Sequence, residues 1–412
     1  MSVESARVDA TSPTPPHGTP LPVPPDAPRE GARVRVFART DVGRTREHNE
    51  DAFLVADLAA ARPLAFDGAD AAPHEFDASR GALFLVADGL GGAAAGEVAS
   101  HLATEAAFHA LRAALPDAAD DATRFATALR DAVLAANAAI HRTAAERADL
   151  RGMATTLTAA ALRGDTLYLA QVGDSRAYLI RAGAARQITK DQSLVQRLVD
   201  AGELTPEQAE TSARRNIILQ ALGADRTVKV DVTHQPVRRG DVLLLCSDGL
   251  SGQLRAAELA DAAAAAPDLD ALCSALIARA NDTGGPDNIT VVAARFDGAA
   301  FAAPADASRP GGAGDGDDEI GHRQFAVLPT PGTTQAIVAD VLAGGGAEDG
   351  AAAAPPAARE GTSDRALDVG GGAADDELLA ERRGRVRMVY VVLALLGASV
   401  AAFYLWRLLS AR

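Results

Sequence analysis

One stretch of this 412-residue chain decides its fold: Leu83-Phe84-Leu85-Val86-Ala87-Asp88-Gly89-Leu90-Gly91-Gly92. Its apolar run reads as a buried strand, and a carboxylate follows at once. A bare carboxylate at the end of an apolar strand is costly unless it is paired or bound to a metal ion. The next residue is glycine, which lets the backbone approach such an ion and offer its carbonyl oxygen. Asp88 and Gly89 are therefore candidate metal ligands.

Further acidic motifs lie on both sides of this stretch. They read Arg46-Glu47-His48-Asn49-Glu50-Asp51, Val172-Gly173-Asp174-Ser175-Arg176, Ser247-Asp248-Gly249 and Gly285-Pro286-Asp287-Asn288. Asp174 and Asp248 again follow apolar runs that read as strands. Several carboxylates together predict an oxygen-ligand site for Mg²⁺ or Mn²⁺.

The chemistry of such a site assigns roles to these residues. Two divalent ions about 3.5–4 Å apart can bridge a hydroxide and clamp a phosphoryl group during in-line displacement. Asp88 is the best candidate for the bridging carboxylate, and Asp248 and Asp287 complete the second ion. Asp51, with Glu50 beside it, can hold metal-bound waters.

Two other residues complete the expected site. Arg46 precedes Asp51 and can fork two hydrogen bonds to phosphate oxygens. Asn288, like Glu50, is expected to support the ligands from outside.

Each motif also has an ordinary explanation when it is taken alone. Asp-Gly is a common turn dipeptide, and residues 285–288 read equally well as a turn before a strand. Asp174 can simply pair with Arg176, and Arg46 can be a solvated charge. The ordered set of motifs is far more specific than its members.

Composition excludes some classes of function. The formal charge is −15, and residues 299–381 hold 15 Asp and Glu against 4 Lys and Arg, a balance of −11. No Lys- or Arg-rich face suggests nucleic-acid binding. The two cysteines, Cys246 and Cys273, fit a reducing compartment, and Cys246 lies close enough to Asp248 to leave oxidation sensitivity open.

The chain divides by composition into segments. We expect a disordered Pro-rich arm at residues 1–30, a globular domain at 31–298 and an acidic Gly/Ala/Pro-rich linker at 299–387. A membrane helix at 388–406 and a short tail at 407–412 would follow. Within the linker, residues 325–342 are more apolar, and what they bind is open.

The globular segment mixes strands and helices. Strands are expected at 34–36, 53–56, 155–162, 167–172, 177–180, 241–247 and 289–296, and helical patterns at 93–114, 121–149, 191–222 and 255–280. Residues 57–80 read as a long loop. Short turns such as Arg163-Gly164-Asp165 favour antiparallel hairpins, so we predict an α+β fold with helices covering sheets.

Residues 388–406 carry no charge over 19 positions, and aromatic residues lie near both ends. That length spans a bilayer. More arginines precede the span than follow it, so the positive-inside rule places the globular domain in the cytoplasm on a C-terminal anchor in the cell inner membrane.

The motif set resembles the PP2C (PPM) family of metal-dependent serine/threonine protein phosphatases, in their bacterial form. The similarity covers about residues 33–298 and is carried by positions 40–51, 88–92, 152–157, 172–176, 215–223, 247–250 and 287–290. It implies a β-sandwich of two antiparallel sheets flanked by helices. It also implies Mn²⁺ or Mg²⁺ as cofactor, with two ions and in many bacterial members a third.

The resemblance carries roles onto matching positions. Asp88 would bridge two ions, the Gly89 carbonyl would bind one of them, and Asp248 and Asp287 would bind the other. Asp51 would support this shell, Arg46 would hold phosphate, and Asp174 with Asp248 would correspond to the third ion.

Three positions depart from the family pattern. Leu90 stands where animal relatives have a histidine proposed as general acid, which leaves the general acid unidentified. Gln192 replaces a frequent histidine, so the role of the turn Asp191-Gln192-Ser193 is open. Ala154 replaces a frequent glycine, which we interpret as a packing change.

We therefore expect a protein phosphatase that is tethered to the membrane and opposes a bacterial Ser/Thr kinase, acting on that kinase and its substrates. A metal-bridging hydroxide would attack phosphorus in line. Two alternatives are a catalytically silent phosphoprotein-binding scaffold and a metal-dependent hydrolase of small phosphoesters.

Overall fold

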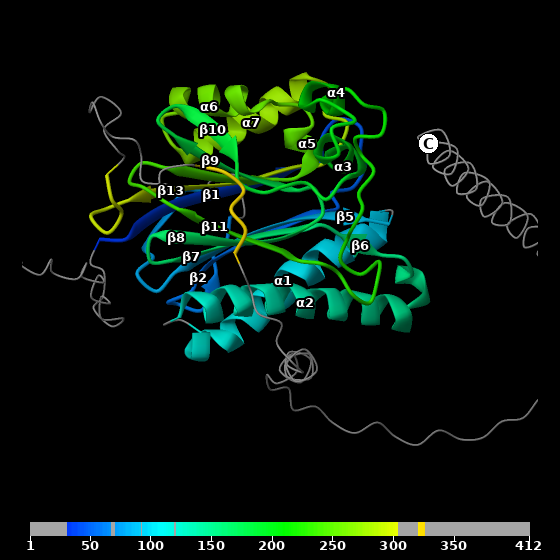
Figure 1. The fold of residues 1–412 in the computed structure, drawn as a ribbon, viewed down its shortest axis with the longest axis horizontal. Helices are drawn as coiled ribbons and strands as arrows, with labels where there is room; N and C mark the ends of the chain where they lie inside the picture. The colour runs from blue at the N-terminus through cyan, green and yellow to red at the C-terminus, as the bar shows by residue number, and fades with distance from the viewer. Residues whose placement is uncertain (1–30, 67–70, 92, 119–120, 304–319, 326–412) are drawn as a thin grey trace, which may run out of the picture. The chain divides into compact units, whose positions relative to one another are not determined.

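Apolar strands of this chain pair into two antiparallel sheets, and helices cover their outer faces (Figure 1). The computed structural model describes residues 31–66, 71–91, 93–118, 121–303 and 320–325. The expected N-terminal arm and the predicted span at 388–406 lie outside the described residues, as does most of the expected linker.

The first sheet brings the two ends of the domain together. Its strand order is β10 (Ala184–Gln187), β9 (Arg176–Arg181), β12 (Val242–Cys246), β13 (Ile289–Asp297), β1 (Arg33–Asp41) and β4 (His74–Asp77). In this register Thr40 of β1 lies opposite Thr290 of β13, and Cys246 of β12 lies opposite Val291. The chain segments that lead into the first acidic motif and out of the last one therefore lie side by side at one end of this sheet.

The second sheet contains the stretch that opened the sequence. Its strand order is β11 (Asp231–Pro236), β8 (Thr166–Val172), β7 (Leu157–Arg163), β5 (Ala82–Leu90), β2 (Asp51–Asp57) and β3 (Arg62–Pro63), while β6 (Ala154–Thr155) also pairs with β5. The register places Asp51 opposite Asp88. The connection from β7 to β8 is the expected hairpin.

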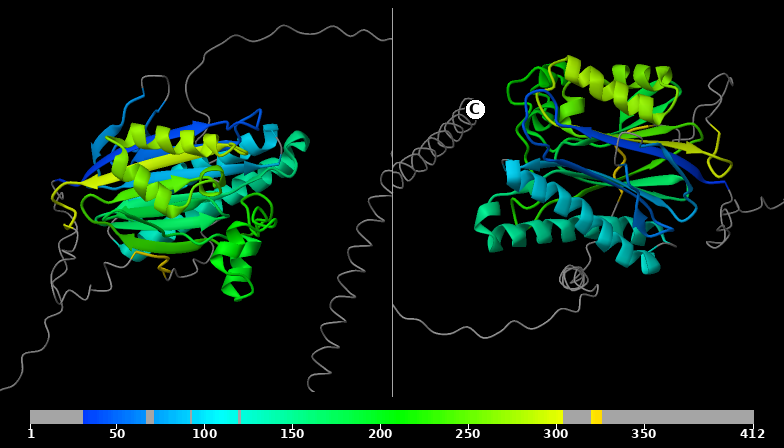
Figure 2. Two further views of the ribbon diagram at one scale, coloured as in Figure 1. Left: turned by 90° about the horizontal axis from the view of Figure 1, so that it is seen from above. Right: turned by 180° about the vertical axis from the view of Figure 1, so that it is seen from behind.

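Alternation along β5 explains the layering. Ala82, Phe84 and Val86 face the core between the sheets, whereas Leu83 and Leu85 face the helices. Those helices are α1 (Ala93–Ala118) and α2 (Ala122–Glu146). Against the other sheet pack α6 (Ala256–Ala265) and α7 (Leu269–Asp282), so both outer faces are covered (Figure 2).

Side-chain caps set several helix starts. Asp121 accepts a hydrogen bond from the Arg124 amide at 2.7 Å before α2, and Asp268 accepts one from the Ala271 amide at 2.8 Å before α7. The smaller helices are α3 (Leu194–Asp200), α4 (Pro206–Glu210), α5 (Asp248–Ser251) and the 3₁₀ turn η1 (Ala148–Leu150).

Two expectations for local structure are wrong in part. Residues 191–222 are helical only in α3 and α4. Near the end of this stretch Ile218 and Leu222 form isolated bridges, and the Leu219 amide donates to Gln192 O at 2.8 Å. The loop expected at 57–80 contains β3 and β4. β10 and β11 were not expected, since short strands with mixed polarity leave little periodic signal.

Packing continues past residue 298, where we predicted the linker to begin. Phe301 is buried with its ring centroid 5.6 Å from that of Phe296. Residues 320–325 lie along β11: the Phe325 amide donates to Val232 O at 2.8 Å, and the His234 amide to Arg323 O at 3.0 Å. Of the apolar patch at 325–342, only Phe325 lies among the described residues, and its ring contacts Tyr168 and His234.

Among the described residues, no helix has both the length and the apolar character that crossing a bilayer requires.

Candidate active site

The acidic motifs meet at one end of the sandwich, where strands of both sheets terminate. Asp51 begins β2 and lies opposite Asp88 near the end of β5. Asp174 follows β8, Asp248 follows β12 as the first residue of α5, and Asp287 precedes β13. The charges of neighbouring aspartates raise the pKa values of Asp88 and Asp248. The fold therefore brings together the aspartates that the sequence indicates.

Hydroxyl groups hold the Asp51 carboxylate. Its Oδ2 accepts hydrogen bonds from Ser247 Oγ and Thr290 Oγ1, both at 2.7 Å. Its Oδ1 is buried and has no hydrogen-bond partner among the described residues. Burial raises the pKa of Asp51 to about 7, although the two hydroxyl bonds oppose this shift.

Backbone contacts fix Asp88 and Gly89. The Asp88 amide donates to Thr156 Oγ1 at 3.0 Å, and the Asp88 carbonyl accepts from the Thr156 amide at 2.9 Å. A Cβ on Gly89 would lie 2.3 Å from Gly96 O and 2.5 Å from Glu50 O. Only glycine therefore fits at the position expected to offer a carbonyl to a metal.

Burial and mutual repulsion raise the pKa values of the clustered carboxylates. Burial, then the charges of Asp51 and Asp248, holds the pKa of Asp88 well above its usual range. Burial, then Asp248, raises the pKa of Asp174 to about 8, and burial, then Asp287, raises that of Asp248. A divalent cation between these carboxylates would offset both the cost of burying their charge and their mutual repulsion.

Arg46 lies on the exposed side of the cluster. Its Nη2 donates to Asp287 Oδ2 at 2.8 Å, and the other Asp287 oxygen accepts from the Asn288 amide at 2.9 Å. The Arg46 side chain is half exposed, so its contact with Asp287 can exchange.

Asn288 joins the first motif to the last. Its Oδ1 accepts from the Glu50 amide at 2.8 Å, and its Nδ2 donates to Val42 O at 3.0 Å and His48 O at 2.9 Å. Burial raises the pKa of the Glu50 carboxyl. Asn288 thus fixes the loop that carries Arg46 and Glu50.

The donor set fits a hard divalent cation. It consists of carboxylate and carbonyl oxygens, which Mg²⁺ and Mn²⁺ prefer. The buried Oδ1 atoms of Asp51 and Asp174 have no hydrogen-bond partner in the part of the chain that the structure describes. Such orphaned oxygens suit an ion better than they suit a packed core.

The carboxylates would have to turn to surround an ion. As they stand, no three His, Cys, Asp or Glu side chains within the described residues are close enough together to hold one. Arg46 engages Asp287, and Asp248 shares a hydrogen bond with Asp88.

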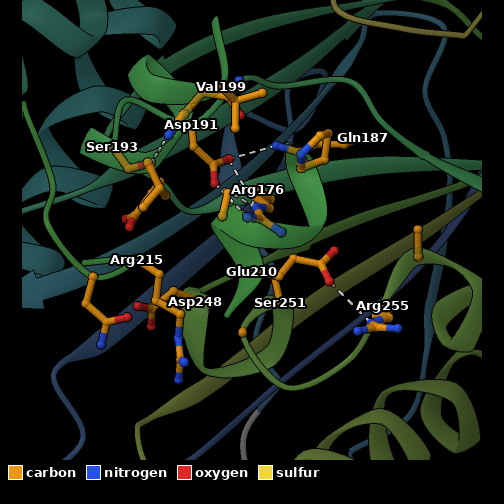
Figure 3. Close-up of a pocket in the computed structure, with 18 of the residues that line it drawn as sticks. Arg176, Gln187, Asp191, Ser193, Val199, Glu210, Arg215, Asp248, Ser251 and Arg255 are labelled. Carbon is orange, nitrogen blue, oxygen red and sulfur yellow. Dashed lines mark hydrogen bonds and ion pairs between the residues drawn. The ribbon is translucent and has the colours of Figure 1, made fainter. Parts of the chain in front are cut away.

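A cavity of about 530 Å³ opens beside Asp174 and Asp248. Figure 3 shows it between the 191–216 segment and the α5–α6 region. Asp191 grips Arg176 with bonds of 2.7–3.0 Å on one side, and Glu210 contacts Arg255 at 3.3 Å on another. Sequence reasoning missed this cavity, because most of its walls come from segments 187–216 and 251–256, which carry no acidic motif.

The sequence also missed the hydroxyl groups behind the aspartates, namely Thr156, Ser247 and Thr290. A signal existed, since Ser247 directly precedes Asp248 and Thr290 lies two positions after Asn288. Cys246, next to the site, is fully buried, and burial raises the pKa of its thiol to about 12.

Two facing sheets with an oxygen-ligand cluster and an arginine at one end define a metal-dependent phosphatase. A family model described as protein phosphatase 2C matches residues 69–284. The chain belongs to the protein phosphatase 2C family. The expected fold and enzyme class are thereby confirmed.

Known relatives agree with this assignment. A protein named serine/threonine phosphatase stp from Listeria welshimeri is 38% identical over 254 residues, which are 62% of this chain and 92% of the relative. The crystal structure of the Mycobacterium tuberculosis serine/threonine phosphatase PstP/Ppp is 38% identical, with a TM-score of 0.52, over 64% of this chain and 99% of that one. A PstP catalytic domain in complex with two manganese ions matches with 38% identity and a TM-score of 0.50, again over 64% and 99%.

Proposed function

We propose that the aspartate cluster and Arg46 carry out the serine/threonine phosphatase reaction of this family member. The carrying observation is the group of carboxylates gathered at one end of the sandwich, Asp51, Asp88, Asp174 and Asp248, whose pKa values are all raised by burial and then by the charges of neighbouring aspartates. Phosphorylated proteins are the substrates, and Mn²⁺ or Mg²⁺ is the cofactor.

The proposal assigns a task to each residue of the cluster. Asp88 would hold both ions, Gly89 would add its carbonyl, and Asp248 and Asp287 would hold the second ion. Asp174 and Asp248 would hold a third. The ions supply electrophilic polarisation of the phosphoryl group and lower the pKa of bound water.

Arg46 would orient the substrate phosphate. Its guanidinium already contacts the carboxylate edge of Asp287 at 2.8 Å, and a phosphate presents the same kind of paired oxygens. The Arg46 side chain is half exposed, so it would meet the phosphate of a substrate that arrives from solvent. Asn288 and Glu50 position the Arg46 loop.

The membrane anchor and a kinase partner are part of the proposal and fall on residues that the structure does not describe. The uncharged sequence at 388–406, preceded by an arginine cluster, supports an inner-membrane anchor with the catalytic domain in the cytoplasm. A tether raises the local concentration of the phosphatase around membrane-bound partners such as a Ser/Thr kinase. Deleting residues 388–412 should move the protein to the soluble fraction, and unchanged fractionation would contradict the anchor.

The main test measures phosphate release by the full-length chain from a phosphothreonine peptide, with Mn²⁺ and with chelator. Asp88→Asn and Asp248→Asn should abolish it. Asp297→Asn is the matched control, because Asp297 also ends a strand before a glycine but pairs with Arg35 outside the cluster. Metal-independent release would overturn the proposal.

The same assay separates the alternatives. A scaffold would bind the peptide and Mn²⁺ without releasing phosphate. A small-phosphoester hydrolase would cleave a nucleotide faster than the peptide.

A further inference from the structure

Gln192 lies at a junction between the Asp174 loop and the segment that walls the cavity. It is one of the positions at which the sequence departs from its family pattern. Its backbone amide donates to Gly173 O at 2.9 Å, and its side-chain Oε1 accepts from the Gly173 amide at 3.0 Å. Gln192 therefore bonds to both the carbonyl and the amide of Gly173, the residue that precedes Asp174.

The clasped loop has little room to move. Gly173 has a φ of +103°, and a Cβ there would lie 2.6 Å from the Thr156 side chain. Thr156 in turn bonds the Asp88 amide and carbonyl. Any shift of Gly173 would displace Asp174, whose Oδ1 is buried without a hydrogen-bond partner among the described residues.

The other bonds of Gln192 lead to the far end of the 191–220 segment. Its carbonyl accepts from the Leu219 amide at 2.8 Å, and its Nε2 lies 3.4 Å from Lys229 O and 3.4 Å from Gln171 O. Ser193, next along the chain, pairs with Ile218. Gln192, which bonds to Gly173 beside Asp174, therefore also joins the beginning of the 191–220 segment to its end.

We propose that Gln192 is a positioning residue, which sets the Asp174 carboxylate for a metal ion and couples that ion to the 191–220 segment. The inference rests on the proposed function, since it concerns an ion at Asp174 and Asp248. Groups that hold a ligand from behind commonly change metal affinity by about 10–100-fold when they are replaced. Gln192→Met replaces the side-chain amide by a thioether of nearly the same volume. It therefore removes the oxygen that accepts a hydrogen bond from the Gly173 amide.

The experiment titrates the full-length chain with Mn²⁺ by calorimetry, for the unmutated protein, Gln192→Met and Gln192→Asn. We expect the weakest Mn²⁺ site of Gln192→Met to lose about 10-fold in affinity, while the tighter sites are unchanged. Gln192→Asn keeps the amide but is one methylene short of Gly173, so it should fall between. Hydrogen exchange at the Gly173 amide should be faster in both variants.

Gln220→Met is the matched control. Gln220 accepts from the Lys229 amide at 2.8 Å and lies 3.4 Å from Lys229 O, so it shares a partner with Gln192 but makes no bond to Gly173. Its Mn²⁺ affinities should equal those of the unmutated protein. Equal losses in the Gln192 and Gln220 variants, or none in either, would overturn the proposal.

The outcome is readable separately from the proposed function. If the unmutated protein binds no Mn²⁺ and releases no phosphate, the proposed function itself fails. If it does both and the weak site is indifferent to Gln192→Met and Gln192→Asn, only the positioning role fails. Circular dichroism shows whether each variant is folded, and Gln192→Asn serves if Gln192→Met is not.

Discussion

The two ends of strand β12 carry aspartates that lie in opposite surroundings. Asp241, before the strand, accepts from Arg181 at 2.9 Å and 2.7 Å and from the Arg238 amide at 2.7 Å. Asp248, after the strand, lies instead among other carboxylates, and its pKa is raised by burial and then by Asp287. A buried carboxylate with its own cation stabilises the fold, whereas one without a cation marks a place for a ligand.

The largest effect should come from the end at which the aspartates cluster. Asp88→Asn removes the proposed bridging ligand, so kcat/KM should fall by about 10³-fold or more. The same change relieves carboxylate repulsion, so the chelated variant should melt above the chelated unmutated protein. Steady-state assays and melting curves in EDTA test both halves, and a variant that is inactive because it is unstable would contradict the comparison.

The opposite end predicts a loss of stability with the chemistry intact. Asp241→Asn leaves the Arg181 guanidinium buried beside a neutral amide, which should cost about 3 kcal/mol of unfolding free energy. Urea denaturation measures that cost. The activity per folded molecule should stay near that of the unmutated protein, and a large drop in kcat would show that Asp241 belongs to the site.

Arg46 and Arg181 offer the same contrast between arginines. Arg181 is 10% exposed at its ion pair, and Arg46 is 51% exposed. Arg46→Ala should therefore leave unfolding free energy nearly unchanged but lower kcat/KM by about 10–100-fold, because a charge-assisted bond to phosphate is lost. Mn²⁺ affinity should not fall. A destabilised Arg46→Ala protein with a normal KM would reverse the assignment.

The last effect is gradual and depends on pH. With metal chelated, the folded protein keeps protons on Asp51 up to about pH 7 and on Asp174 up to about pH 8, whereas an unfolded aspartate releases its proton near pH 3.9. The folded state then holds more protons between these limits, so stability falls as pH rises from about 4 to about 8. Melting temperatures in EDTA should show this slope, and it should be shallower in Asp51→Asn. With Mn²⁺ the gain in melting temperature should grow with pH, since protons compete with the ion.

The two aspartates that flank β12 show what can be predicted from the sequence and what cannot. Asp248 could be predicted as a metal ligand because it follows an apolar strand and precedes Gly249. Asp241 stands before its run, and its partner Arg181 lies on another strand, so no local pattern indicates the pair. The residues that hold ligands from behind, such as Ser247 and Gln192, were missed as partners because their contacts depend on register rather than composition.

The fold shows the same limit. Long helices and the strands around Asp88 and Asp174 follow from periodicity, as does the hairpin between β7 and β8. The polar pattern of residues 191–222 resembles a surface helix, but after α4 the chain turns, and Ile218 and Leu222 pair with distant backbone. Residues 320–325 pair with β11 through an isolated bridge between Gln324 and Thr233, across a long stretch of chain, which no local propensity can indicate.

Both thiols of the chain are sealed in its core. Cys246 and Cys273 are 0% exposed, and burial raises the pKa of each. A cysteine placed by mutation on the surface of the 191–220 segment would therefore be the one thiol that maleimide reagents reach in the native protein. A single fluorophore or spin label there would report when the segment moves as Mn²⁺ or a phosphopeptide arrives, in a chain that needs no prior removal of its own cysteines.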